Sequence, residues 1–320
     1  MSPITRLVGV RQARRTARAG RAVMQLTAFL PLAARAALFE VKQEGSSRQL
    51  SDGTVVAIDL WIPQRLDPGL PAPPYAAVVL AHGFARNRTY MHNNARHMAE
   101  RGIVVATPDS PGWFGAGAQA ANIDAMVGHF GWLVARSGAP GDSLAGLVDP
   151  ARLGAAGHSA GGAVGFEAAI ALQGGDTPLR AVFLLDAVPW DRTLTAAPGL
   201  RPLTFGSWRA APSSCNADGN VLALIENVAS PVTDVRVIGA THCDPENPTD
   251  FLCTLTCGGG SASARSLFQR AMTLFFLDAF VISLADEPES YASFLRRVEA
   301  EGKVVSKPLP GRDGDTLQLY

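Results

Sequence analysis

Short hydrophobic runs alternate along this chain with longer stretches whose apolar residues recur at helical spacing. Continuous apolar runs at residues 75–81, 103–106 and 181–185 are typical of strands buried on both faces of a sheet. The stretch at 119–137 is long enough and mixed enough to predict a helix. Strands that alternate with helices predict an α/β fold, with a mainly parallel sheet covered by helices on both faces.

The same pattern predicts the remaining elements. Two strands, at 38–41 and 54–62, are expected to pair antiparallel around the turn Ser51-Asp52-Gly53. The other expected strands are 152–156 and 235–238, with a weaker pattern at 202–205, and the other expected helices are 90–101, one ending near 172, 262–284 and 287–301. A polar tail closes the chain. We see no internal repeat, no long linker and no insertion large enough for a lid, so residues 40–320 are expected to form one domain.

Charged residues are unevenly distributed along the chain. Seven of its 28 basic residues lie within residues 1–39, which contain no acidic residue, and an apolar run follows the last of the clustered arginines. Ala34-Arg35-Ala36 offers a small-x-small cleavage site, so residues 1–39 are interpreted as a leader for export, to a secreted or periplasmic location. The alternatives are an ordinary N-terminal helix of a cytoplasmic protein, or translation that starts at Met24.

Composition narrows the classes of partner. The chain has 320 residues, a formal net charge of zero and a hydrophobic fraction of 47%, which fits a globular core and does not point to nucleic acid. The apolar run near the N-terminus is too short and interrupted for a confident membrane span. Composition alone leaves the oligomeric state open.

Four cysteines, Cys215, Cys243, Cys253 and Cys257, all lie in the C-terminal half. Their even number and clustering predict one or two disulfides in an oxidising compartment, and we expect Cys243 to pair with one of the other three. Four free thiols are the alternative, and a zinc site is disfavoured because no CxxC pair occurs.

The strongest chemical motif is Gly157-His158-Ser159-Ala160-Gly161, which matches G-x-S-x-G and lies between an expected strand and an expected helix. This context places a serine on a sharp turn above the end of the sheet, where glycines avoid collisions with neighbouring backbone. Ser159 is therefore the expected nucleophile. The N–H of Ala160, at the start of the helix, is an expected donor to a developing oxyanion.

Two further positions complete the expected machinery. His82-Gly83-Phe84 directly follows the strand at 75–81, and the N–H of Phe84 is expected to be the second oxyanion donor, with His82 in a packing role. Because the base follows the nucleophile in chain order in this architecture, it must be His242, the one histidine after Ser159.

The acid has three candidates. Asp186 directly ends the strand at 181–185, where a carboxylate is held rigidly enough to accept the Nδ1–H bond of His242. We therefore expect a carboxylate oxygen of Asp186 within hydrogen-bond reach of that nitrogen, about 2.6–3.2 Å. Asp191 and Asp218 remain alternatives.

The motifs His-Gly-Phe, Gly-His-Ser-Ala-Gly-Gly, Leu-Leu-Asp-Ala-Val-Pro-Trp and Ala-Thr-His-Cys-Asp resemble the chlorophyllase and cutinase-like polyester-hydrolase branch of the α/β-hydrolases, over about residues 50–285. The resemblance implies a Ser-His-Asp carboxylic-ester hydrolase. Chlorophyllases carry the acid where Asp186 stands, whereas the polyester hydrolases carry it one strand later, where this chain has Gly206-Ser207-Trp208.

Aromatic residues on the expected site loops suggest an apolar cleft. Trp113, Phe114 and Trp190 are expected to contact the substrate, along with Phe84 and Trp208, because loops at the carboxyl ends of strands line the site in open α/β sheets. The expected partner is a small or polymeric ester.

No cofactor or metal is implied by this chemistry. The acidic residues Asp244, Glu246 and Asp250 offer oxygen ligands for calcium, but a solvated loop is the preferred interpretation. Two other functions stay open. An acyltransferase uses the same triad with a different acceptor, and a catalytically silent binding protein can share the fold.

Overall fold

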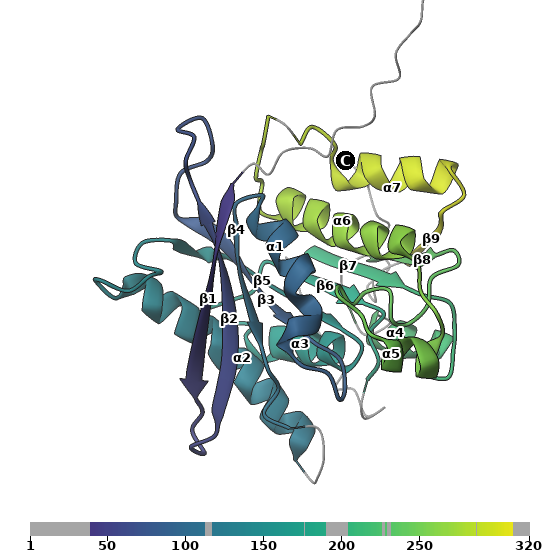
Figure 1. Cartoon of the computed structure of the whole chain (residues 1–320), viewed down its shortest axis with the longest axis horizontal. Helices are drawn as coiled ribbons and strands as arrows, with labels where there is room; N and C mark the ends of the chain where they lie inside the picture. The colour runs from purple at the N-terminus through teal and green to yellow at the C-terminus, as the bar shows by residue number, and fades with distance from the viewer. Residues whose placement is uncertain are drawn as a thin grey trace, which may run out of the picture. The chain divides into compact units, whose positions relative to one another are not determined.

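One nine-stranded sheet organises the described part of this chain in the computed structural model (Figure 1). The structure describes residues 39–112, 117–175, 177–189, 204–225, 228, 232–285 and 287–309. The strand order is β1-β2-β4-β3-β5-β6-β7-β8-β9. The strands are β1 (Glu40–Gln49), β2 (Val55–Gln64), β3 (Tyr75–Ala81), β4 (Ile103–Pro108), β5 (Val148–His158), β6 (Ala181–Leu185), β7 (Thr204–Arg209), β8 (Val232–Val237) and β9 (Val304–Leu309).

The central strands, from β4 to β8 in this order, all run parallel. The outer strands β1, β2 and β9 are antiparallel to their neighbours. The expected α/β class with a mainly parallel sheet is therefore confirmed, and no separate lid domain is evident among the described residues.

Helices cover both faces of this sheet. Neighbouring residues of β5 point to opposite faces: a side chain at Gly154 would meet Phe276 and Phe280, whereas the Ala155 side chain faces the place where a side chain at Gly165 would lie. Phe276 belongs to α6 and Gly165 to α3, so these two helices lie on opposite sides. The helices are α1 (His92–Ala99), α2 (Ala118–Gly138), α3 (Ala160–Ala171), α4 (Asp218–Ile225), α5 (Phe251–Cys257), α6 (Ala262–Ala279) and α7 (Tyr291–Ala300), with a 3₁₀ turn at Arg88–Met91.

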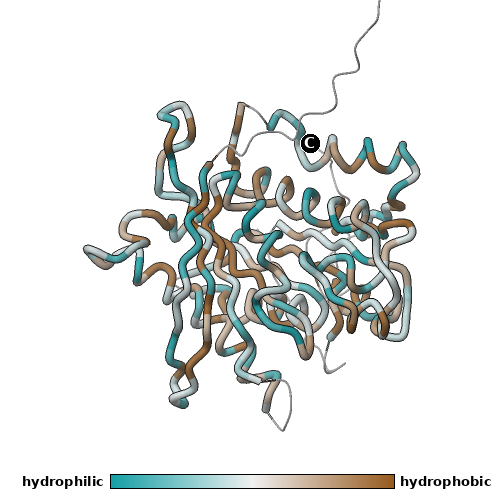
Figure 2. The backbone as a smooth tube through the Cα atoms, viewed as in Figure 1, coloured by the Kyte–Doolittle hydropathy of each residue, from teal (hydrophilic) through white to brown (hydrophobic). Residues whose placement is uncertain are grey.

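Burial follows the sequence pattern most closely at the centre of the sheet. Every residue of β3, β4 and β6 is buried, as continuous apolar runs predict for parallel strands. Figure 2 shows hydrophobic positions concentrated in these central strands, whereas β1 at the sheet edge is largely hydrophilic. The boundaries of β3 and β6 match the prediction at both ends.

The prediction is wrong at the edges and in the short elements. β1 extends to Gln49, well beyond the expected end at 41, because an edge strand with exposed side chains needs no hydrophobic alternation. β9 lies in the expected polar tail for the same reason, and pairs antiparallel with β8. The short helices α4 and α5 were not expected. The turn at residues 51–53 is confirmed, since β1 and β2 pair from Gln49 with Val55 outward.

The parallel strands all end at one edge of the sheet, where their loops meet. The loops after β3, β5, β6 and β8 carry Phe84, Ser159, Asp186 and His242 respectively. Among the described helices, none is both long and apolar enough to span a membrane. The expected leader, apart from Phe39, lies outside the described residues.

Candidate active site

Ser159 sits on a sharp turn between β5 and α3. Its φ is +54°, in the region that residues with a side chain rarely adopt, and its N–H donates to the carbonyl of Leu185 at 3.0 Å. The flanking glycines make the turn possible: a side chain at Gly157 would collide with the backbone of Gly161, and one at Gly161 with the carbonyl of His82. The strand, turn and helix expected around the G-x-S-x-G motif are all present.

Three side chains form a hydrogen-bonded chain at this turn. The Oγ of Ser159 lies 2.9 Å from Nε2 of His242, and Nδ1 of His242 lies 2.7 Å from Oδ2 of Asp186. All three residues are buried. The expected contact between Asp186 and His242 is therefore present at the expected distance. Because Nδ1–H donates to the carboxylate, Nε2 is left as the acceptor that faces the serine hydroxyl.

The protonation of His242 is biased toward the neutral form. Burial lowers its pKa, the hydrogen bond to Asp186 raises it, and the neighbouring His158 lowers it, with a net shift below the ordinary value. The two rings lie 4.7 Å apart, and Nε2 of His158 donates to the carbonyl of His242 at 2.7 Å. His158, the variable residue of the motif, thus fixes the backbone of His242.

A cavity of about 550 Å³ opens beside Ser159 and His242. Phe84 and Ala160 lie in its wall, and Val188, Pro189 and Leu252 give it an apolar surface. Gly83 lets the Phe84 loop approach closely, because a side chain there would come within 3.1 Å of Ser159 Cβ. Ala160 begins α3, so its N–H belongs to the first helical turn, which has no acceptor within the helix.

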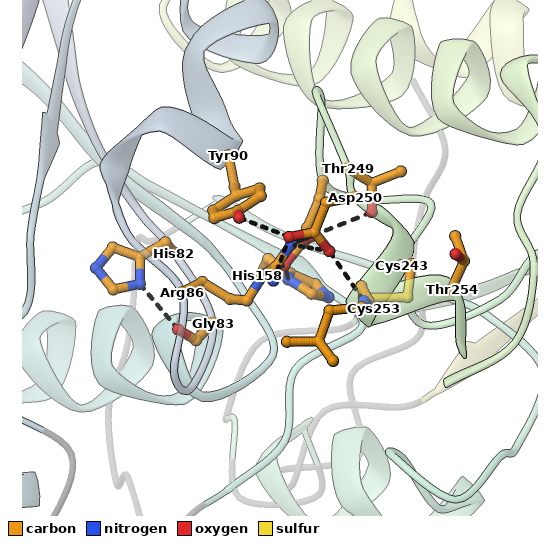
Figure 3. A network of polar contacts seen from close by, with 12 residues as sticks. His82, Gly83, Arg86, Tyr90, His158, Cys243, Thr249, Asp250, Cys253 and Thr254 are labelled. Carbon is orange, nitrogen blue, oxygen red and sulfur yellow. Dashed lines mark hydrogen bonds and ion pairs between the residues drawn. A yellow bond between two sulfur atoms is a disulfide. The ribbon is translucent and has the colours of Figure 1, made fainter. Parts of the chain in front are cut away.

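A partly buried ion-pair network joins the Phe84 loop to the His242 loop (Figure 3). Arg86 donates from Nε and Nη2 to the two carboxylate oxygens of Glu246, each at 2.8 Å, and from Nη1 to Asp250 at 3.1 Å. Its guanidinium stacks over the Tyr90 ring, whose hydroxyl donates to Asp250 at 2.6 Å. Nδ1 of His158 lies 3.6 Å from Glu246.

The sequence interpretation of a solvated acidic loop is wrong for Asp244 and Glu246, whereas Asp250 is partly exposed. Asp244 and Glu246 are both 1% exposed. Asp244 accepts bonds from the N–H groups of Thr241 and Ser261, and Asp250 caps the first turn of α5. Burial raises the pKa of Glu246, but the nearby His158 and the hydrogen bonds from Arg86 outweigh this and hold the pKa below its usual range. These carboxylates hold loops in place, through contacts between residues whose proximity cannot be predicted from the sequence pattern.

Two disulfides attach α5 to the site. Cys243 is bonded to Cys253, and Cys215 to Cys257. The expected disulfide at Cys243 is therefore confirmed, with Cys253 as its partner. The sulfurs of Cys243, Cys253 and Cys257 lie within 4.8 Å of one another, but all are oxidised and none is available as a thiolate ligand.

The expected aromatic residues have different outcomes. Phe84 is 39% exposed and lines the cavity, whereas Trp208 is fully buried. Trp208 donates to the Tyr291 hydroxyl at 2.8 Å and stacks on Phe294, so its suggested place in the cleft is wrong. Trp208 belongs to β7, and its side chain packs in the core against Phe268 and Phe294. Trp113, Phe114, Trp190 and the alternative acid Asp191 lie outside the described residues.

The other alternative acid, Asp218, begins α4, while Asp186 occupies the position beside His242 Nδ1. Sequence reasoning missed Asn216, whose side chain contacts both oxygens of Asp186. It also missed Arg86 and its pairing with Glu246, which lies 160 residues later in the chain. Only the placement of Asn216 beside a cysteine and of Arg86 beside the Phe84 motif could have drawn attention to them.

No protein-family model matches the chain, and no curated protein shows significant similarity to it.

Proposed function

We propose that this protein is a serine hydrolase that cleaves carboxylic esters. The observation that carries the proposal is the buried chain from Ser159 through His242 to Asp186, at the floor of a partly apolar cavity. A serine hydroxyl that faces an imidazole, with a carboxylate behind the imidazole, is the arrangement that generates an oxygen nucleophile at neutral pH.

The proposed reaction begins with attack of Ser159 Oγ on the ester carbonyl carbon, while His242 Nε2 takes the hydroxyl proton. Asp186 holds the imidazole in the required tautomer and stabilises the imidazolium. The N–H groups of Phe84 and Ala160 receive the oxyanion. His242 then protonates the leaving alcohol. His242 deprotonates a water molecule, which attacks the acyl-serine carbonyl carbon. The bond from the acyl carbon to Ser159 Oγ then breaks, His242 returns the proton to Oγ, and the carboxylic acid is released.

The apolar wall formed by Phe84, Val188, Pro189 and Leu252 favours an ester with an apolar acyl or alcohol group. We propose Trp113, Phe114 and Trp190 as further substrate contacts, on the sequence pattern alone. The two disulfides fit an oxidising compartment. With the basic, acid-free leader, they support a secreted or periplasmic location, which intact-mass analysis of protein from its native host would test.

The test of the function is hydrolysis of p-nitrophenyl acetate and butyrate by wild type and by Ser159→Ala. We expect sustained turnover from wild type and a loss of at least about 10³-fold in kcat from the variant, with folding unchanged. Ser207→Ala is the matched control, since its buried hydroxyl has no hydrogen-bond partner among the described residues and lies in β7, away from the cavity. Activity that survives Ser159→Ala, or a burst that stalls without an added alcohol, would contradict the proposal.

A further inference from the structure

The carboxylate of Asp186 is held by more than His242. Its Oδ1 accepts from the backbone N–H of Ala210 at 3.2 Å. The side-chain Nδ2 of Asn216 donates to both carboxylate oxygens, at 3.0 and 2.9 Å. Asp186 is 2% exposed and Asn216 is 7% exposed, so water has little access to either group. The orientation of the carboxylate therefore depends on these protein donors.

Asn216 is itself fixed in one orientation. Its Oδ1 accepts from the hydroxyl of Ser213 at 2.6 Å, and that hydroxyl oxygen accepts from the N–H of Cys215 at 3.1 Å. The backbone N–H of Ser213 donates in turn to the carbonyl of Asn216. A flipped amide would face an oxygen to the Asp186 carboxylate, so the network assigns the NH₂ group to that side.

A covalent bond holds this loop beside Asn216. Cys215, the preceding residue, is joined to Cys257 at the end of α5. The same helix is joined through Cys253 to Cys243, the residue that follows His242. One short helix thus anchors both the loop that reaches the acid and the loop that carries the base.

We propose that Asn216 is a positioning residue, which orients Asp186 toward His242, and that the Cys215–Cys257 disulfide acts on the site through Asn216. This inference rests on the proposed function. Through the two hydrogen bonds from its side-chain amide, Asn216 keeps the plane of the Asp186 carboxylate oriented so that Oδ2 faces Nδ1 of His242. Without them the carboxylate keeps, among the described residues, the Ala210 N–H and the imidazole as partners, and it can rotate away from the geometry that fixes the tautomer.

The first experiment compares Asn216→Ala with wild type. We expect kcat to fall about 10- to 100-fold, the equivalent of one or two hydrogen bonds to a charged group, with little change in KM. The downfield Nδ1–H resonance of His242 should weaken or move upfield. Asn216→Leu, close in shape and without a donor, should give the same losses and serves if the alanine variant does not fold.

Ser214→Ala is the matched control. Ser214 lies in the same loop and donates to the carbonyl of Thr256, without touching Asp186. Its kcat and the His242 resonance should match wild type. If folded Asn216→Ala and Asn216→Leu both keep kcat within about twofold and leave the resonance unchanged, Asn216 has only a structural role and the proposal is overturned.

A double-mutant cycle tests the disulfide. If removal of the disulfide by Cys215→Ser and Cys257→Ser acts through Asn216, the triple variant with Asn216→Ala should have a kcat less than about twofold below that of Asn216→Ala alone. Fully additive losses would refute the connection. The rate at which a fluorophosphonate labels Ser159 separates this inference from the ester assignment. A wild type that labels but hydrolyses no ester refutes the function alone, whereas equal labelling of wild type and Asn216→Ala refutes the positioning role alone.

Discussion

Replacing Asp186 by asparagine tests the acid with almost no change in shape. The Ala210 N–H is a fixed donor to Oδ1, so the new amide keeps its oxygen at that position and turns its NH₂ group toward His242. That NH₂ group then donates to Nδ1 of His242, which must become the acceptor. The imidazole proton moves to Nε2, the atom that faces Ser159, and His242 can no longer accept the serine proton.

The expected loss in kcat is about 10⁴-fold, as for the same change in a serine protease, or about 5.4 kcal/mol at 1.36 kcal/mol per tenfold. The amide also removes the negative charge that stabilises the imidazolium. Asn216 adds to the effect, because its own NH₂ group would then face the new NH₂ group at one of its two contacts. The full loss should appear in kcat, with substrate binding nearly unchanged.

The assay is p-nitrophenyl butyrate hydrolysis near neutral pH, with thermal melting recorded for each variant. Asp234→Asn is the matched control, since Asp234 is a buried aspartate of β8 that pairs with Arg209 at 3.0 Å, away from the cavity. It should melt at a lower temperature and keep its kcat. An Asp186→Asn variant that retains more than about a tenth of wild-type kcat would refute the assignment of the acid.

Three further outcomes follow from the structure. Gly161→Ala should lose activity and about 1–3 kcal/mol of stability, because the new methyl group would collide with the carbonyl of His82. Gly165→Ala, whose added methyl group would make ordinary contacts in the same helix, should fold and hydrolyse ester normally. Thermal melts and ester assays compare the two variants. The acid limb of kcat/KM should lie below pH 6.5, because the pKa of His242 is lowered, and a limb above 7 would contradict this. Burial lowers the pKa of His97 and of His129 to about 3, so the unfolded chain binds more protons below pH 6.5. Stability should therefore fall as pH drops from 6.5 toward 3, and His129→Gln should reduce this slope in urea titrations.

The central sheet was predictable from its continuous apolar runs, because a strand buried on both faces needs apolar residues at nearly every position. The glycine motif and the single late histidine similarly placed Ser159 and His242. Their chemistry demands particular residue types at particular points of the chain. The polar edge strands β1 and β9 carry no such signal, since most of their side chains are exposed or only half-buried and backbone pairing holds them to the sheet.

The loop that carries His242 was the least predictable part of the candidate site. Its carboxylates suggested exposure to solvent, yet Glu246 is buried and paired with Arg86, which lies 160 residues earlier in the chain. Long-range pairs of this kind leave no periodic pattern in a sequence. The disulfide partners were open for the same reason, since spacing alone does not choose among four cysteines.

The order of the strands explains why this loop needs so many supports. His158 pairs with Leu185 across β5 and β6, so Ser159 and Asp186 begin on neighbouring strands. His242 follows β8, three strands from β5, and at about 4.8 Å per strand its loop must cross about 14 Å of sheet edge. An unsupported loop of that reach would lose the imidazole geometry to conformational freedom. The Cys243–Cys253 disulfide, the Arg86–Glu246 pair and the bond from His158 to the His242 carbonyl each remove part of that freedom.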